Sequence, residues 1–347
     1  MTGGARATMR DVASLAGVSA KTVSNVVTGA VPVREDTRER VEQAMRKLDF
    51  VPNLSARGLR NGRSGVIAVS LPFLATSFSS ELMHRIVEAA HRRGLAVHIE
   101  ETGADPGRER ELLSRARAHL VDGLILNPIR LEDSSVGGDD LPPVVLIGEV
   151  ENRSTDHVGI DSVAGAAELT RHVLSRGATR IAVLGADDEN TFGTATSRLR
   201  LQGVRQALGE AGIPLDPRLE VNNPDWTMTG GVAATELLLS RGIPFDAIIA
   251  FTDSLATGAL HVLRGHGVDV PGQVLVTGFD DVEVSRYTAP PLTTVAIDLP
   301  AFAGAAVDRL VARIADRSGP AQSITVPHRL VLRESTDAAP RGFDPRP

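Results

Sequence analysis

Two hydrophobic patterns follow one another along the chain, and the change between them lies near residue 65. After that point, continuous apolar runs typical of buried strands alternate with stretches whose apolar residues recur at helical spacing. Strands are expected at residues 66–71, 96–99, 123–126, 144–147, 180–184, 247–251 and 274–279, and helices at 82–93, 108–119, 163–175, 197–211, 231–240 and 254–266. The order strand–helix–strand–helix–strand occurs twice, which predicts an α/β body of two doubly wound parallel sheets.

Each of these sheets is expected to form one lobe of the body. The first lobe is predicted to comprise about residues 65–161 and 293–323, and the second about 162–292 and 324–337. Ligands of such folds bind outside the carboxyl ends of the strands, so the cleft between the lobes is the expected site. Residues 338–347 are rich in Pro, Arg and Asp and are predicted to be a disordered tail.

Before residue 65 the spacing of apolar residues is helical only. Residues 10–27, RDVASLAGVSAKTVSNVV, predict two short helices joined by a tight turn at Gly17, where glycine tolerates a positive φ. Ser19 is placed to cap the second helix by accepting a backbone hydrogen bond from Lys21 or Thr22. The apolar face expected for the first helix consists of Val12, Ala13, Leu15 and Ala16.

In the second helix, Val23, Val26 and Val27 recur at i, i+3 and i+4 and are expected to face inward. The outer face then carries Ala20, Lys21, Ser24 and Asn25. A small, polar, singly charged face suits the major groove of DNA, which favours a helix-turn-helix. The alternative is an ordinary pair of helices packed in a core.

A third helix is expected at residues 35–48, completing a DNA-binding domain of residues 1–52. Residues 53–64 follow as a hinge and linker, in which Asn53 is placed to cap a short helix at 54–60. So short a helix is mostly unfolded alone, and Gly58 costs it about 1 kcal/mol relative to alanine. The segment is therefore either a plain linker or a hinge that becomes helical on DNA, with Leu59 as a minor-groove wedge.

Charge divides the chain at the same place. The whole sequence has 37 Lys and Arg against 43 Asp and Glu, whereas residues 1–65 have 11 against 6, which leaves 26 against 37 in the remainder. A basic head on an acidic body indicates that only the head binds a polyanion. The net charge of −6 is therefore no argument against DNA binding.

Several protein classes are disfavoured by what the sequence lacks. It has no cysteine, so disulfides and thiolate metal sites are excluded. No apolar run approaches the roughly 18 residues of a membrane span, and the first ten residues contain no secretory signal core, so a cytoplasmic protein is expected. GxSxG, HExxH and P-loop motifs are absent, as is a GxGxxG after the first strand, so no enzyme, cofactor or metal site is expected.

Three motifs together resemble the lactose-repressor (LacI/GalR) family of bacterial transcription factors. They are DVASLAGVSAKTVSNVV, VPNLSARGLR and APPLTTV, and the resemblance covers about residues 8–336. It implies an all-α helix-turn-helix head followed by a two-lobed, periplasmic-binding-protein-like α/β body. It also implies a homodimer whose heads read a pseudo-palindromic, double-stranded operator.

The resemblance assigns roles to residues of the head. Ala20, Lys21 and Asn25 match the base-reading positions, although family members often have arginine where Asn25 stands. The positions that usually hold phosphates correspond to Ser19, Thr22, Ser24 and Asn53, and the minor-groove hinge positions to Ala56 and Leu59. Arg34 stands where a capping serine is usual before the third helix, so the start of that helix is less certain.

In the body the resemblance implies a small-molecule effector site, commonly for a sugar. The expected effector-binding residues are Phe78, Ser79, Glu149, Ile160, Arg200, Trp226, Asp253 and Asp280. Asp253 and Asp280 both follow a predicted strand, although Asp253 is also placed to cap the next helix. Acidic groups with one arginine and one indole favour a neutral polyhydroxy ligand.

These observations predict a ligand-responsive, sequence-specific DNA-binding regulator that represses carbohydrate-use genes. The alternative with the same body is a sugar-binding receptor without a DNA role, which would have no basic head and would need an export signal. The sequence has no heptad-bearing C-terminal segment, so a dimer is expected rather than a coiled-coil tetramer.

Overall fold

The computed structural model describes residues 7–28, 31–50, 63–117, 121–128, 143–149, 155–186, 195–223 and 225–346. Contacts within the molecule divide the chain into two compact units, Met1–Gly65 and Val66–Pro347. Within the described ranges, no helix combines the length and the apolar character that a membrane crossing requires.

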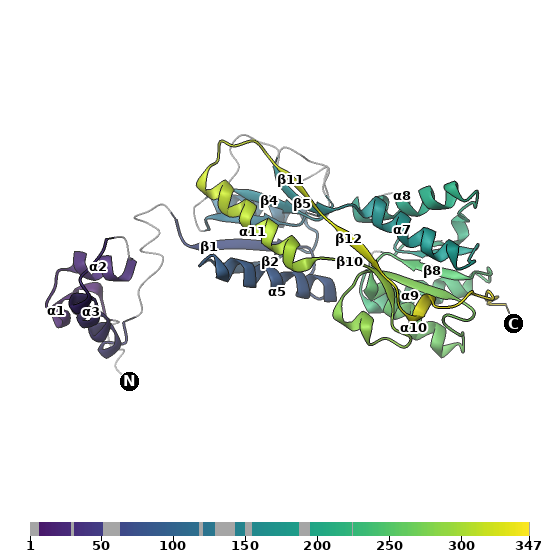
Figure 1. The fold of residues 1–347 in the computed structure, drawn as a ribbon, viewed down its shortest axis with the longest axis horizontal. Coiled ribbons are helices and arrows are strands. Elements are labelled where there is room, and N and C mark those ends of the chain that lie inside the picture. Colours follow the sequence, from purple (N-terminus) through teal and green to yellow (C-terminus); the bar gives the residue numbers. More distant parts are fainter. Residues whose placement is uncertain are drawn as a thin grey trace. The chain divides into compact units, whose positions relative to one another are not determined.

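The described residues of the first unit form three helices (Figure 1), namely α1 (Met9–Ala16), α2 (Ala20–Thr28) and α3 (Glu35–Lys47). They enclose a small buried core of Val12, Ala13, Ala16, Val23, Val41 and Ala44. Val26 and Val27 pack against this core while remaining partly exposed. The predicted inward face of the second helix is therefore confirmed.

A tight turn joins α1 to α2. Gly17 has a φ of 64°, a left-handed conformation that a residue without a Cβ adopts at little cost. The Ser19 hydroxyl accepts a hydrogen bond from the Thr22 N–H at 3.1 Å, as expected for the cap of the second helix. At the start of α3, the Arg34 side chain makes no capping hydrogen bond, and the helix begins at Glu35 regardless.

The predicted apolar face of α1 is wrong at one residue, Leu15. Leu15 is 51% exposed, whereas Val12 and Ala16, one helical turn apart, are buried. Residue 15 falls outside the inner stripe that these two define. The expected hinge helix at residues 54–60, with Asn53, Ala56 and Leu59, lies outside the described residues.

The second unit contains two six-stranded sheets with helices on both faces. The first has the order β2-β1-β3-β4-β5-β11, with every pair parallel. Its strands are β1 (Val66–Leu71), β2 (Ala96–Glu101), β3 (Gly123–Leu126), β4 (Val144–Ile147), β5 (Asp156–Ile160) and β11 (Ser323–Val326). The helices that cover it are α5 (Ser77–Arg92), α6 (Pro106–Arg117) and α11 (Leu299–Ala315).

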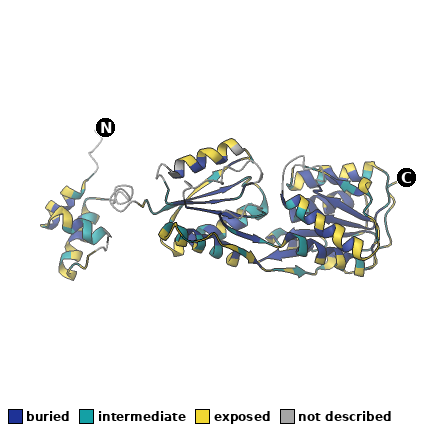
Figure 2. Cartoon of the chain, turned by 90° about the horizontal axis from the view of Figure 1, so that it is seen from above, coloured by how far each residue is buried: buried dark blue, intermediate teal, exposed yellow. Residues whose placement is uncertain are grey.

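Alternation along the strands assigns these helices to opposite faces of the sheet. In β1, Ile67, Val69 and Leu71 belong to the cluster that includes α5 and α11, whereas Ala68 packs with Leu112 and Leu113 of α6. Successive side chains of a strand point to opposite faces, so a continuous apolar run serves both cores. Figure 2 shows the central strands buried and the outer sides of the helices exposed, whereas the edge strand β2 is mostly exposed.

The second sheet has the order β7-β6-β8-β9-β10-β12. Its strands are β6 (Ile181–Leu184), β7 (Glu220–Val221), β8 (Ala247–Ala250), β9 (Leu275–Asp280), β10 (Thr293–Ile297) and β12 (His328–Val331), of which only β12 runs antiparallel to its neighbour. One face packs on α7 (Ser162–Ser175) and α8 (Ala195–Glu210), and the other on α9 (Met228–Ser240) and α10 (Asp253–Gly265). The described part of this lobe also contains three short 3₁₀ helices: η1 (Pro217–Leu219), η2 (Glu283–Arg286) and η3 (Glu334–Thr336).

The chain crosses between the two sheets three times: from β5 to α7, from β10 to α11, and from β11 to β12. The predicted lobe boundaries are wrong at two of these crossings. β10, expected in the first lobe, pairs with β9 of the second sheet, and β11, most of which was expected in the second lobe, pairs with β5. The apolar pattern of a buried strand carries no information about which sheet it joins.

The prediction of a disordered tail is wrong for residues 338–346. Phe343 exchanges backbone hydrogen bonds of 3.0 and 2.8 Å with Phe245, and the two rings meet edge to face with centroids 5.8 Å apart. The Arg341 N–H donates to the Gly272 carbonyl at 3.0 Å. An aromatic contact and backbone hydrogen bonds thus attach a segment whose composition alone is typical of disorder.

Candidate ligand cavity and nucleic-acid interface

A cavity of about 580 Å³ lies where the carboxyl ends of both sheets meet. Its wall includes residues at or just after the ends of strands from each sheet, such as Asn127 after β3, Glu149 after β4, Thr252 after β8 and Asp280 at the end of β9. This is the position at which parallel α/β sheets bind ligands, and the volume suits a small molecule.

Most of the predicted effector residues line this cavity. α5 contributes Phe78 and Ser79, the first sheet contributes Glu149 and Ile160, and the second lobe contributes Arg200, Trp226 and Asp280. Residues far apart in the sequence are therefore brought together as expected. Asp161, beside Ile160, caps α7 by accepting from the Ala164 N–H at 2.8 Å and has a structural role.

Asp253 is the exception, because it is fully buried and does not line the cavity. The cap of α10 is Thr252, whose hydroxyl accepts from the Leu255 N–H at 3.2 Å. The Asp253 carboxylate instead accepts hydrogen bonds from Val282, Ser285 and Thr294. Both roles considered for this aspartate, effector contact and helix cap, are therefore wrong.

Arg200 is surrounded by protein groups and is only 5% exposed. Its guanidinium donates to the Phe251 carbonyl and to Ser162 Oγ, and it lies 3.6 Å from the centroid of the Phe279 ring. One of its nitrogens is 3.6 Å from an Asp280 oxygen. The protein thus balances the charge of Arg200, and the Arg200 side chain holds the neighbouring residues of the cavity wall in place.

Two carboxyl groups of the wall are buried. Burial raises the pKa of Asp280 well above its ordinary value, although the Arg200 charge opposes this effect. Burial also raises the pKa of Glu149, against the hydrogen bond donated by Ser162 and the charge of Arg200. Both carboxyl groups therefore hold a proton more readily than an exposed carboxyl group does.

Trp226 is half-buried in the wall and packs against the apolar clusters on both faces of the second sheet. A rigid indole of this kind provides a flat apolar surface beside polar groups. Its place in the polar turn before α9 agrees with the prediction that it is no ordinary core residue.

Several polar wall residues were missed from the sequence, namely Asn127, Thr196, Asn222, Asn223, Asp225, Thr252 and Ser254. Four of them lie within two residues of the end of a strand, β3 for Asn127, β7 for both Asn222 and Asn223, and β8 for Thr252. The rule that identified Asp280 would have found these four residues as well. Among the described residues, no group of three or more metal-binding side chains is placed to hold a metal ion.

In the first unit, α2 presents the face predicted to read DNA. Ala20 and Lys21 are exposed, and Ser24 and Asn25 are half-exposed on the same helix. Ser19 and Thr22, at the start of α2, also bond to each other through their hydroxyls at 2.9 Å. Apart from this cap, the helix keeps its polar side chains outside its packed valines.

A helix-turn-helix unit joined to a two-lobed α/β body with a cavity at its strand ends defines a class of ligand-responsive regulators. Residues 8–53 match the description "Bacterial regulatory proteins, lacI family", and residues 170–336 match "Periplasmic binding protein-like domain". The transcriptional regulator DegA of Bacillus subtilis is 33% identical over 338 residues, covering 95% of this chain and 98% of that protein. The chain belongs to the LacI family and is a DNA-binding transcriptional regulator.

Two solved structures extend the comparison to the whole fold. The Lac repressor dimer bound to operator and the anti-inducer ONPF aligns with a TM-score of 0.81 at 28% identity, covering 96% of this chain and 99% of that one. The complex of the regulator CelR with cellobiose aligns with a TM-score of 0.70 at 29% identity, covering 95% and 100%. The two-lobed α/β fold predicted from the sequence is confirmed.

Proposed function

We propose that this protein represses transcription as a homodimer on a pseudo-palindromic operator, and that a neutral, sugar-like effector in the cavity changes its operator affinity. The observation that carries the proposal is the cavity itself, whose polar strand-end groups and Trp226 come from two lobes of a chain that begins with a helix-turn-helix. The relatives are transcriptional regulators, which favours regulation over catalysis.

For the DNA half, we infer that α2 lies in the major groove. Lys21 donates to guanine, Asn25 binds adenine and Ala20 contacts a thymine methyl, whereas the phosphates are held by Ser19, Thr22, Ser24 and Asn53. Ala56 and Leu59 are proposed to enter the minor groove at the centre of the operator. The operator in the Lac repressor structure supports a DNA site of this kind.

For the effector half, the buried pairing of Arg200 favours an uncharged ligand. An anion would find the arginine already balanced by Asp280 and bonded to the Phe251 carbonyl. Hydroxyl groups would instead be recognised by the amides, threonines and carboxyls of the wall. The cellobiose complex of CelR supports a sugar as the ligand class.

The regulation follows from a shift between conformations of the two lobes. An effector that contacts both lobes favours one arrangement of them over the other, which changes how the paired heads meet the operator. A coupling free energy of about 1–3 kcal/mol would alter operator affinity about 5- to 150-fold.

The proposal is tested in two steps with the purified full-length chain. Duplexes selected from a random library give the operator, and Trp226 fluorescence is then titrated with neutral mono- and disaccharides. We expect a pseudo-palindromic consensus, a change in Trp226 emission with at least one sugar, and a change in operator affinity with that same sugar. Absence of a consensus would contradict the DNA role, and absence of any spectral response would contradict the effector role.

Lys21→Ala provides a sharper test of the DNA face. Because Lys21 is exposed and contributes no packing, the variant should fold normally while losing affinity for the selected operator by about 10- to 100-fold. Leu59→Ala should weaken the same complex if the leucine enters the minor groove. Unchanged affinity in both variants would contradict the assignment.

A further inference from the structure

The effector cavity depends on a turn with a strained backbone. Asp280 and the next residue, Asp281, have φ values of 116° and 55°, in a region that L-residues other than glycine avoid. Two such residues in succession persist only where the surroundings hold them. Because Asp280 faces the cavity, whatever holds this turn also sets the position of a wall carboxyl.

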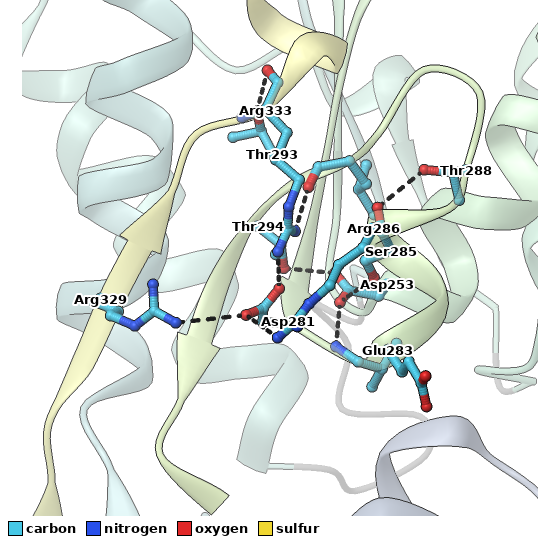
Figure 3. A network of polar contacts seen from close by, with 12 residues as sticks. Asp253, Asp281, Glu283, Ser285, Arg286, Thr288, Thr293, Thr294, Arg329 and Arg333 are labelled. Carbon is cyan, nitrogen blue, oxygen red and sulfur yellow. Dashed lines mark hydrogen bonds and ion pairs between the residues drawn. The ribbon is translucent and has the colours of Figure 1, made fainter.

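Asp253 supplies much of that hold, as Figure 3 shows. One oxygen of its carboxylate accepts from the Val282 N–H at 2.9 Å and from the Ser285 hydroxyl at 2.6 Å, and the other accepts from the Thr294 hydroxyl at 2.5 Å. The first two donors belong to the segment that follows the strained turn, whereas Thr294 belongs to β10.

The fully buried Asp253 carboxylate is packed closely against β9. At Gly278, a Cβ would lie 2.2 Å from an Asp253 oxygen, so the strand approaches the carboxylate as closely as glycine allows. Asp281, the second residue of the strained turn, is held by ion pairs with three arginines. Arg333 contacts it directly, and nitrogens of Arg286 and Arg329 lie 3.8 and 3.7 Å from its carboxylate.

The same turn also reaches the other lobe. The Glu283 N–H donates to a carboxylate oxygen of Glu81 at 2.8 Å, and Glu81 lies on α5, the helix whose Phe78 and Ser79 line the cavity. From Asp280 to Glu283, four consecutive residues therefore contain both a cavity wall group and a hydrogen bond between the lobes.

We propose that Asp253 is a positioning residue for effector binding: it fixes the turn from Asp280 to Glu283 so that the wall carboxyl and the contact with α5 form together. The inference rests on the proposed effector role of the cavity and identifies the buried residue that fixes the geometry of that site. Asp253 itself touches no part of the cavity.

The chain offers a matched control in Asp246, which lies directly before β8 as Asp253 lies shortly after it. Asp246 is 6% exposed and accepts backbone hydrogen bonds from Thr179 and Arg180 at 3.0 and 2.8 Å. It does not line the cavity. A second matched pair lies within the network, because Ser285→Ala removes a donor on the turn side of Asp253 and Thr294→Val removes one on the β10 side.

The first readout is the affinity for whichever neutral sugar, cellobiose included, gives the largest change in wild-type Trp226 emission. Asp253→Asn should raise the dissociation constant about tenfold, and Asp246→Asn by less than about twofold, with folding checked by circular dichroism. Ser285→Ala should weaken binding by about threefold and Thr294→Val should not. Equal affinities within each pair would overturn the proposal.

Amide exchange of Glu283, measured without any sugar, is the second readout. Exchange should be faster in Asp253→Asn and Ser285→Ala than in Asp246→Asn, because release of the turn breaks the bond to Glu81. If no sugar changes wild-type emission, the effector role fails and this readout alone decides the positioning role. Exchange at the same rate in all variants would overturn it.

Discussion

Two buried aspartates of the body are held in opposite ways. Asp156, at the start of β5, is fully buried and receives Arg313 at 2.7 Å, Arg309 at 3.1 Å and the Gln322 N–H at 2.8 Å. Asp280, at the end of β9, has Arg200 at 3.6 Å, a cation that also bonds to Phe251 and Ser162. Asp156 is thus fully paired with protein groups, whereas Asp280 is incompletely paired and lines a cavity.

The pKa values follow this difference. Burial alone would raise the pKa of Asp156, but the hydrogen bonds from Arg313 and Gln322 and the charge of Arg309 lower it below its ordinary value. Burial raises the pKa of Asp280, because Arg200 at 3.6 Å compensates only in part and the charges of Asp253 and Glu81 act in the same direction as burial. The comparison teaches that a fully paired buried charge stabilises a fold, whereas an incompletely paired one is available to a ligand.

The largest effect is expected from Asp156→Ala. Loss of the carboxylate leaves Arg309 and Arg313, both mostly buried, without their shared counter-charge, which should lower the free energy of unfolding by about 3–5 kcal/mol. Urea denaturation measures this value. Sugar affinity should remain as in the wild type, and unchanged stability would show that the two aspartates do not differ in the way proposed.

Asp280→Asn should show the reverse pattern. Its sugar affinity should fall by about 10- to 100-fold, because the asparagine amide places an obligatory donor where this wall carboxyl has an oxygen that can accept from the ligand. The free energy of unfolding should change less than in Asp156→Ala, because Asp280 is incompletely paired in the free protein. Fluorescence titration and urea denaturation on the same sample separate the two quantities.

The pH dependence of stability should sharpen the comparison further. Burial raises the pKa of Asp253 from 3.8 to about 7, so the folded state binds a proton more tightly than the unfolded state. The contribution of Asp253 to the free energy of unfolding is therefore greatest when the pH is below the ordinary aspartate pKa. It falls as the pH rises toward 7, by at most about 1.4 kcal/mol per pH unit. Asp156 has the opposite effect, because its pKa is lowered in the folded state. Its contribution to stability is present when the pH is above the ordinary aspartate pKa and is lost in acid.

Unfolding free energies measured between pH 4 and 8, for the wild type and for Asp253→Asn, test this point. The variant should have a shallower decline across that range, because one group that binds its proton preferentially in the folded state is absent. Parallel profiles for the two proteins would contradict a raised pKa at residue 253.

Glu149→Gln should give the smallest effect. Burial already shifts this side chain toward its neutral form, and a glutamine oxygen can still accept from Ser162. Sugar affinity should therefore change by no more than about threefold at neutral pH. A large loss would show that ligand binding depends on the carboxyl group of Glu149, as we expect it to depend on that of Asp280.

Much of the fold could be predicted because the central strands of its sheets are buried on both faces. Residues 123–126 and 144–147 contain no polar side chain, and the apolar run at 66–71 is interrupted only by Ser70; all three form strands with the predicted bounds. β5 was not predicted because its sequence, DHVGI, places polar or small residues among the apolar ones. Its Asp156 is buried only because two arginines from α11, distant in the sequence, pair with it.

The candidate site could be predicted only in part, and Asp253 and Asp280 show why. Both lie at or just after the end of a buried, predicted strand, and the sequence offers the same reason to place each in the cleft. The structure separates them because Asp253 is the first residue of α10 and turns toward β10, whereas Asp280 is the last residue of β9. That distinction depends on tertiary contacts with Ser285 and Thr294, which no local pattern encodes.

The three passages of the chain between the sheets have a consequence for how the protein is made. The first sheet acquires its edge strand β11 and its covering helix α11 only from residues 299–326, near the end of the sequence. A ribosome releasing the chain from the N-terminus would thus expose an unfinished first lobe throughout translation of the second. Neither lobe corresponds to one uninterrupted stretch of gene, so exchanging a lobe with a relative would require splicing at every crossing point.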